Sequence, residues 1–122
     1  MFCTSVNTYQ DMDALRCKTT TYTNGHTEQL SVVLYQSTLS DYSSCAKRIV
    51  DHCINNSFQT INFDYEENGY PSTISAKVYL TEHDFDKGNV AFEMTYRPDV
   101  DEAKIFNYDI KNNSENFIYE FN

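Results

Sequence analysis

The sequence predicts an α+β fold in which one main α-helix packs on an antiparallel meander sheet. One segment near the middle of the chain has a sustained helical period, and the segments around it alternate between apolar and polar residues, as half-buried strands do. A helix with one apolar stripe has to bury it, and a sheet with one apolar face offers the surface. With 122 residues the chain is long enough for one core, so we expect a single domain over residues 1–122 with the order roughly β-β-α-β-β-β-β-β.

The helix is predicted between Asp41 and Asn56. Ser40 or Asp41 can accept a hydrogen bond from the free amides of the first turn, and the Asn55-Asn56 pair suits the left-handed residue that often ends a helix. We expect one face of this helix to be buried against the sheet, and its apolar residues are Tyr42, Cys45, Ala46, Ile49 and Cys53.

A β-hairpin is predicted before the helix. Residues 17–23 have the β-branched and aromatic composition of a strand, and residues 28–35 alternate in polarity. The pair Asn24-Gly25 between them is typical of a tight turn in which both central residues have a positive φ, with the next two residues allowing a longer loop or a bulge. Residues 11–16 indicate no more than a helical turn or coil.

Five strands are predicted after the helix, because apolar residues alternate in each of the segments. Residues 60–65, 74–81 and 90–96 have short links and should form the antiparallel meander. The first link contains Asn68-Gly69, and the second is expected to be an acidic loop over residues 82–89. Residues 106–110 and 117–121 are two further strand candidates that extend the sheet or curl over it.

The formal net charge is −9, and its distribution is uneven. Residues 1–60 carry five acids and four bases, whereas residues 61–122 carry thirteen acids and five bases. This excess repels phosphates and anionic lipid, so we expect no direct binding to nucleic acid or to a membrane surface. The alternatives left open are a merely solvated surface and an acidic face that docks on a basic partner. No segment is long and apolar enough to span a membrane, and no signal peptide is visible.

The four cysteines allow two interpretations. Cys45 and Cys53 lie eight residues apart on the predicted helix, about 12 Å, so they cannot bond to each other. In an oxidised protein Cys3 and Cys17 would therefore have to pair with Cys45 and Cys53, as in an extracytoplasmic domain. Otherwise Cys45 and Cys53 are buried thiols, and the protein is cytoplasmic. The sequence leaves the location open.

No catalytic residue, metal site or cofactor is predicted. The sequence lacks a G-x-S-x-G motif, a recognisable Cys-His arrangement and a phosphate-binding glycine loop. A metal cluster of Cys45, His52 and Cys53 is disfavoured because His52 and Cys53 point in different directions on a helix. The acidic segment around His83 lacks the spacing of a calcium loop, so a solvated turn is the better interpretation.

The strongest functional indication is a combination of acidic side chains with tyrosines, which are common at protein interfaces. We therefore expect a small non-enzymatic binding protein, of the inhibitor or immunity type, that docks an acidic sheet face on a basic protein partner. The alternative is a secreted or lipoprotein-type accessory domain that is cross-linked by two disulfides and has a structural or ligand-holding role. The sequence does not indicate the oligomeric state. The residues predicted for the binding surface are Glu66, Glu67, Tyr70, Tyr79, Glu82 and Asp84.

Overall fold

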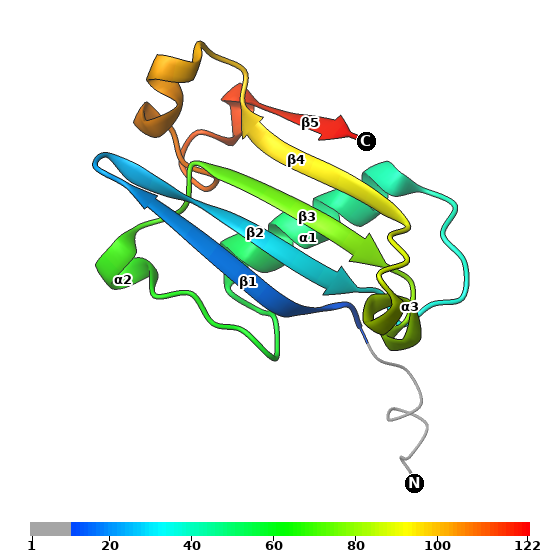
Figure 1. The fold of residues 1–122 in the computed structure, drawn as a ribbon. Coiled ribbons are helices and arrows are strands. Elements are labelled where there is room, and N and C mark those ends of the chain that lie inside the picture. Colours follow the sequence, from blue (N-terminus) through cyan, green and yellow to red (C-terminus); the bar gives the residue numbers. More distant parts are fainter. Residues whose placement is uncertain (1–10) are drawn as a thin grey trace, which may run out of the picture.

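A computed structural model describes residues 11–122 and shows an α+β fold built on one five-stranded sheet (Figure 1). The strands lie side by side in the order in which they follow in the chain. They are β1 (Asp13–Tyr22), β2 (Gly25–Val33), β3 (Thr73–Tyr79), β4 (Phe92–Pro98) and β5 (Phe117–Phe121). The helices are α1 (Tyr42–Asn55), α2 (Tyr65–Asn68) and α3 (Glu82–Lys87), with 3-10 turns η2 (Glu102–Asn107) and η3 (Ser114–Asn116).

The sheet is mixed rather than wholly antiparallel. The pairs β1–β2, β3–β4 and β4–β5 are antiparallel, but β2 and β3 run parallel, with Thr27 opposite Thr73 and Val33 opposite Tyr79. Parallel neighbours need a crossover connection, and the chain from α1 through α2 supplies it. The predicted order is therefore only roughly matched, since the meander is β3-β4-β5.

Helix α1 is confirmed, together with its start and its end. The side chain of Asp41 accepts a hydrogen bond of 3.0 Å from the amide of Ser44, and Asn56 ends the helix with φ 53° and ψ 48°. Of the five residues predicted to be buried, all but Tyr42 are buried. Tyr42 is 46% exposed, and its ring stacks on that of Phe92 with the centroids 4.5 Å apart.

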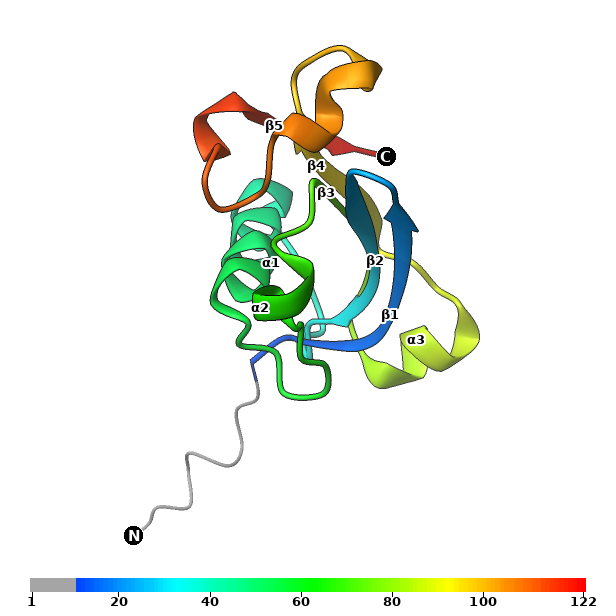
Figure 2. The same ribbon diagram turned by 90° about the vertical axis from the view of Figure 1, so that its left-hand side faces the viewer.

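The core lies between α1 and one face of the sheet (Figure 2). Strand β2 sends Leu30 and Val32 into it, and β3 sends Ile74 and Val78, which agrees with the alternation in the sequence. The members that α1 contributes are Cys45, Ala46, Ile49, Val50 and Cys53.

The hairpin between β1 and β2 differs from the prediction. Tyr22 pairs with Gly25, so the turn consists of Thr23 and Asn24, and neither is among the described residues with a positive φ. Gly25 is needed for a different reason, because a Cβ atom there would lie 2.7 Å from Cδ1 of Phe106. Strand β1 also begins earlier than expected, so the predicted helical turn or coil over residues 11–16 is wrong from Asp13 onward.

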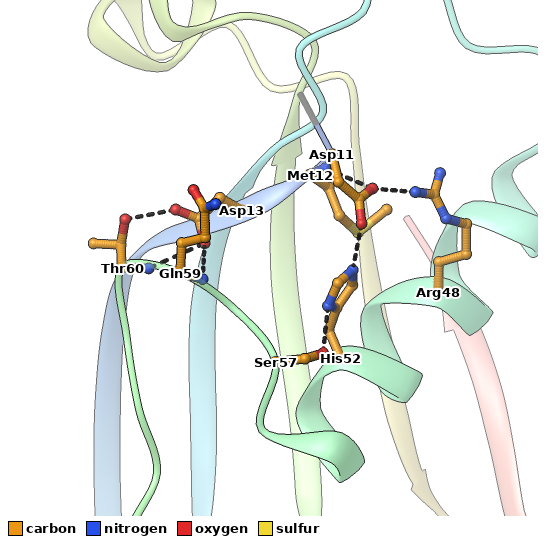
Figure 3. Close-up of polar contacts among 8 residues, drawn as sticks. All are labelled: Asp11, Met12, Asp13, Arg48, His52, Ser57, Gln59 and Thr60. Atoms are coloured by element: carbon orange, nitrogen blue, oxygen red, sulfur yellow. Dashed lines mark hydrogen bonds and ion pairs between the residues drawn. The ribbon is translucent and has the colours of Figure 1, made fainter. Parts of the chain in front are cut away.

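The predicted strand over residues 60–65 is absent, although its side chains still alternate in burial. Here side chains replace a neighbouring strand. The amide group of Asn56 bonds both the N–H and the carbonyl of Phe63, at 2.9 Å each. The buried carboxylate of Asp13 accepts hydrogen bonds from the backbone of Gln59 and from the backbone and hydroxyl of Thr60 (Figure 3). The backbone is satisfied without a sheet ladder, so this segment is a loop.

Two further segments differ from the prediction. Residues 106–110 form no strand, because Phe106 belongs to η2 and Ile110 donates its amide to the carbonyl of Pro71 at the end of the sheet. The expected acidic loop over residues 82–89 contains helix α3, which begins at the Thr81 cap and ends at Gly88 with φ 76°. The last predicted strand is confirmed as β5.

Candidate functional site

The residues predicted for the binding surface fall into two groups. Glu66 and Glu67 are exposed on α2, and Tyr70 follows them, whereas Glu82 and Asp84 lie on α3. Helices α2 and α3 are at opposite ends of the sheet (Figure 1). The structure therefore does not bring these residues together in one surface.

The two predicted tyrosines are more enclosed than expected. Tyr79 points to the face of the sheet away from α1, but α3 covers it, with the ring of Phe85 at 5.2 Å in an edge arrangement. Tyr79 is consequently only 7% exposed. Tyr70 is partly buried against Tyr65, with ring centroids 4.2 Å apart, and the ammonium group of Lys111 lies 5.2 Å from its ring.

The sheet face opposite α1 is also not the acidic face that was expected. In the strand register Arg16, Ser31, Lys77 and Glu93 form one row across four strands. Lys18 and Glu120 stand at the two ends of the neighbouring row, so these two rows carry three cations and two carboxylates. The acidic charge of the molecule must therefore lie elsewhere.

Much of that charge lies at one end of the sheet, which we call the hairpin end and define as residues 22–25, 62–70 and 99–116. These segments touch one another: the rings of Tyr22 and Phe106 have centroids 5.0 Å apart, and Lys111 approaches Tyr70 as described. Tyr22 is 50% exposed and is the accessible tyrosine here. Eight acids oppose two bases at this end: Asp64, Glu66, Glu67, Asp99, Asp101, Glu102, Asp109 and Glu115 against Lys104 and Lys111.

A cavity of about 550 Å³ opens at the hairpin end between the β1–β2 hairpin and residues 62–69. The buried carboxylate of Glu28 and the imidazole of His26 line it, although the next two residues that β2 sends to this side of the sheet, Leu30 and Val32, are apolar. One oxygen of Glu28 accepts a hydrogen bond of 2.5 Å from Thr19 and one of 3.1 Å from the thiol of Cys17. The other oxygen lies 3.5 Å from Nε2 of His26.

The thiol beside this carboxylate is poorly suited to act as a nucleophile. Burial, the hydrogen bond to Glu28 and the charge of Glu28 together raise the pKa of Cys17 to about 12. The thiolate is the reactive form of cysteine, and it is scarce at neutral pH when the pKa is this high. Glu28 therefore sits among groups that donate hydrogen bonds rather than beside a nucleophile that it could activate.

Sequence reasoning missed Glu28 and His26. A signal for them does exist, because His26, Glu28, Leu30 and Val32 occupy alternate positions of β2, and the last two are core residues. A charged residue in the inward row of a strand has to meet a partner or a cavity.

The thiols of Cys17, Cys45 and Cys53 are free in the structure. Cys3 lies outside the described residues, so the predicted pairing of Cys3 and Cys17 with Cys45 and Cys53 stays a prediction. Comparing the intact mass with and without reductant tests it, since two disulfides remove four protons. Burial raises the pKa of Cys45 to about 11, and burial is also the main cause of the raised pKa of Cys53.

A second polar cluster joins the start of β1 to the end of α1 (Figure 3). Oδ2 of Asp11 lies 3.0 Å from Nε2 of His52, and Nδ1 of His52 lies 2.7 Å from the hydroxyl of Ser57. The guanidinium group of Arg48 contacts the other oxygen of Asp11. This order of carboxylate, imidazole and hydroxyl resembles the arrangement that activates a serine nucleophile.

The surroundings of Ser57 do not favour that chemistry. An activated serine needs N–H donors for the oxyanion, but the amide of Ser57 already donates to the carbonyl of His52 at 3.0 Å. The carboxyl end of α1 also places negative dipole charge there, which opposes an oxyanion. The cluster is better explained as a structural contact, in which Arg48 and His52 hold Asp11 against α1.

Two negative findings concern residues 11–122. No three His, Cys, Asp or Glu side chains of this part are grouped as metal ligands. No helix in the same part is both long and apolar enough to cross a bilayer. Comparisons with protein-family models, with curated protein sequences and with solved structures found no match.

Proposed function

We propose that this protein is a non-enzymatic binding protein whose acidic hairpin end docks on a basic protein partner. The supporting observation is the concentration of charge. The hairpin end carries eight acids and two bases, a net charge of −6, out of −9 for the whole chain. Complementary charge steers association and selects partners, and the effect is largest when the charge is gathered on one surface.

The composition of the hairpin end also supports a protein partner. Tyr22 combines an exposed aromatic ring with a polar hydroxyl, and the cavity beside it offers a concave surface. Aromatic side chains next to a pocket are common anchors of protein interfaces. Of the residues predicted from the sequence, this surface retains Glu66, Glu67 and Tyr70, and it leaves out Tyr79, Glu82 and Asp84.

Affinity capture tests the proposal. The immobilised protein should retain, from an extract of its own source, a protein of basic isoelectric point that mass spectrometry can identify. Rising salt should elute it, because screening weakens exposed charge pairs within a Debye length of about 8 Å at physiological ionic strength. Retention that salt does not change, or that an immobilised E66K/E67K variant matches, would contradict the proposal.

A further inference from the structure

The cavity at the hairpin end contains a buried carboxylate, Glu28, whose ion-pair partner among the described residues is a histidine and not a lysine or an arginine. Glu28 is 4% exposed, and no lysine or arginine among the described residues lies within 4.0 Å of it. Its Oε1 atom has two donors, a hydroxyl and a weakly donating thiol. Its Oε2 atom has the imidazole of His26 at 3.5 Å and no shorter hydrogen bond among the described side chains. A buried carboxylate is costly unless a cation or several donors face it.

The other residues that line the cavity also favour a cation over an anion or an apolar group. Asp64 and Glu67 add two exposed carboxylates, and the part of the chain that the structure describes contributes no lysine or arginine to the lining. Phe63 and Tyr22 add aromatic rings on which a flat cation can stack. The volume of about 550 Å³ lies in the range of pockets that hold small ligands, and its opening to solvent suits a side chain that enters from another protein.

We propose that this cavity receives one arginine side chain of a basic protein partner, with the guanidinium group facing Glu28 between Asp64 and Glu67. The inference rests on the proposed function and adds the anchoring contact to it. Arginine fits better than lysine because its planar fork pairs with carboxylates through two hydrogen bonds and stacks on aromatic rings. It is also less strongly hydrated than an ammonium group, so it loses less on entering a partly buried site.

The first experiment uses Nα-acetyl-arginine amide as the probe and follows the amide signals of the full ¹⁵N-labelled chain by NMR. Saturable shifts should centre on Glu28, Asp64 and Glu67, with a dissociation constant of roughly 1–10 mM, as expected for so small a ligand. The citrulline analogue has the same shape without the charge, and it should bind at least about tenfold more weakly. Equal shifts with both probes, or shifts that do not saturate, would overturn the inference.

Two variants test the assigned carboxylates. Glu28→Gln should weaken arginine binding about tenfold or more, and Glu67→Gln should weaken it about threefold. Glu67 is exposed, and its side chain makes no hydrogen bond to another residue within 11–122. Glu67→Gln should therefore fold, and it tests the inference even if Glu28→Gln does not fold. Asp86→Asn removes the same charge from α3 at the other end of the sheet and should leave binding unchanged. Binding that survives both Glu28→Gln and Glu67→Gln would refute the arginine site.

An all-lysine peptide separates this inference from the proposed function. If the peptide binds and E66K/E67K weakens it, while the arginine probe is not held, then the docking surface stands and the arginine site is wrong. If the peptide does not bind, the proposed function itself fails, whatever the small probe does.

Discussion

Reversing two charges at either end of the sheet should have very different effects on the capture of a basic peptide. The variant E66K/E67K changes the first turn of α2, and the control E82K/D84K changes the first turn of α3. Both bring the net charge of the chain from −9 to −5, and both place lysines near a helix N-terminus. The pair therefore matches in total charge and in local structural cost, and differs in position.

The expected magnitude follows from the spacing. The seven residues of β3 separate the two helices, and at 3.3 Å per residue this is roughly 20 Å, more than two Debye lengths at 0.15 M salt. Exposed charge pairs contribute about 0.2–1 kcal/mol each. E66K/E67K changes the hairpin end by four charges, from −6 to −2, so it should cost roughly 1–3 kcal/mol, about a fivefold to 150-fold loss of affinity. E82K/D84K should change affinity by less than about threefold.

Fluorescence anisotropy with a labelled all-lysine peptide measures these affinities at several salt concentrations, and circular dichroism confirms that both variants fold. If both variants lose affinity equally, the peptide responds to the total charge and the hairpin end is no specific surface. If only E82K/D84K loses affinity, the partner docks at α3.

Three further predictions concern the fold. Ile49→Ala should lower the free energy of unfolding by about 2–5 kcal/mol in urea titrations, because Ile49 is wholly buried under the sheet, and a loss below about 1 kcal/mol would contradict this packing. Burial raises the pKa of Cys17 to about 12 and of Cys45 to about 11 from 9.0, so the folded state keeps thiol protons that the unfolded chain releases. The contribution of these two thiols to stability should be constant below pH 9.0 and fall between there and about pH 12. The fall should be smaller in Cys45→Ala, and an equal fall would contradict burial of that thiol. Gly25→Ala should cost roughly 1–3 kcal/mol through its clash with Phe106, and a cost that persists in a Phe106→Ala background would refute this explanation.

The sequence predicted the elements whose local signals agree with one another. For helix α1, the period of its apolar residues, the N-cap residue Asp41 and the C-terminal residue Asn56 all predicted the same helix. Strands β3 and β4 alternate cleanly and were found in place. The parallel pairing of β2 with β3 was missed because alternation shows which face of a strand is buried and says nothing about its neighbour.

The strand over residues 60–65 was predicted wrongly for the same reason. Its alternation reports burial on one side, but the backbone partners of Phe63 and Thr60 are the side chains of Asn56 and Asp13. A single polar side chain that replaces a strand leaves no periodic signal.

The candidate site was predictable in part. Its acidic character follows from the composition. The structure places Glu66, Glu67 and Tyr70 at the same end of the sheet, and their role in binding stays a prediction. The grouping with Glu82 and Asp84 failed because sequence proximity to β3 does not show at which end of the strand a loop emerges. The contribution of residues 99–116 depends on long-range contacts such as that between Phe106 and Tyr22.

The most direct measurement for the central claim is an NMR map of the surface that a basic peptide covers. An all-lysine peptide titrated into the ¹⁵N-labelled chain should shift amide signals in residues 22–25, 62–70 and 99–116, and added salt should reverse the shifts. Shifts confined to α3, or to the sheet face that carries Arg16 and Lys77, would contradict the account.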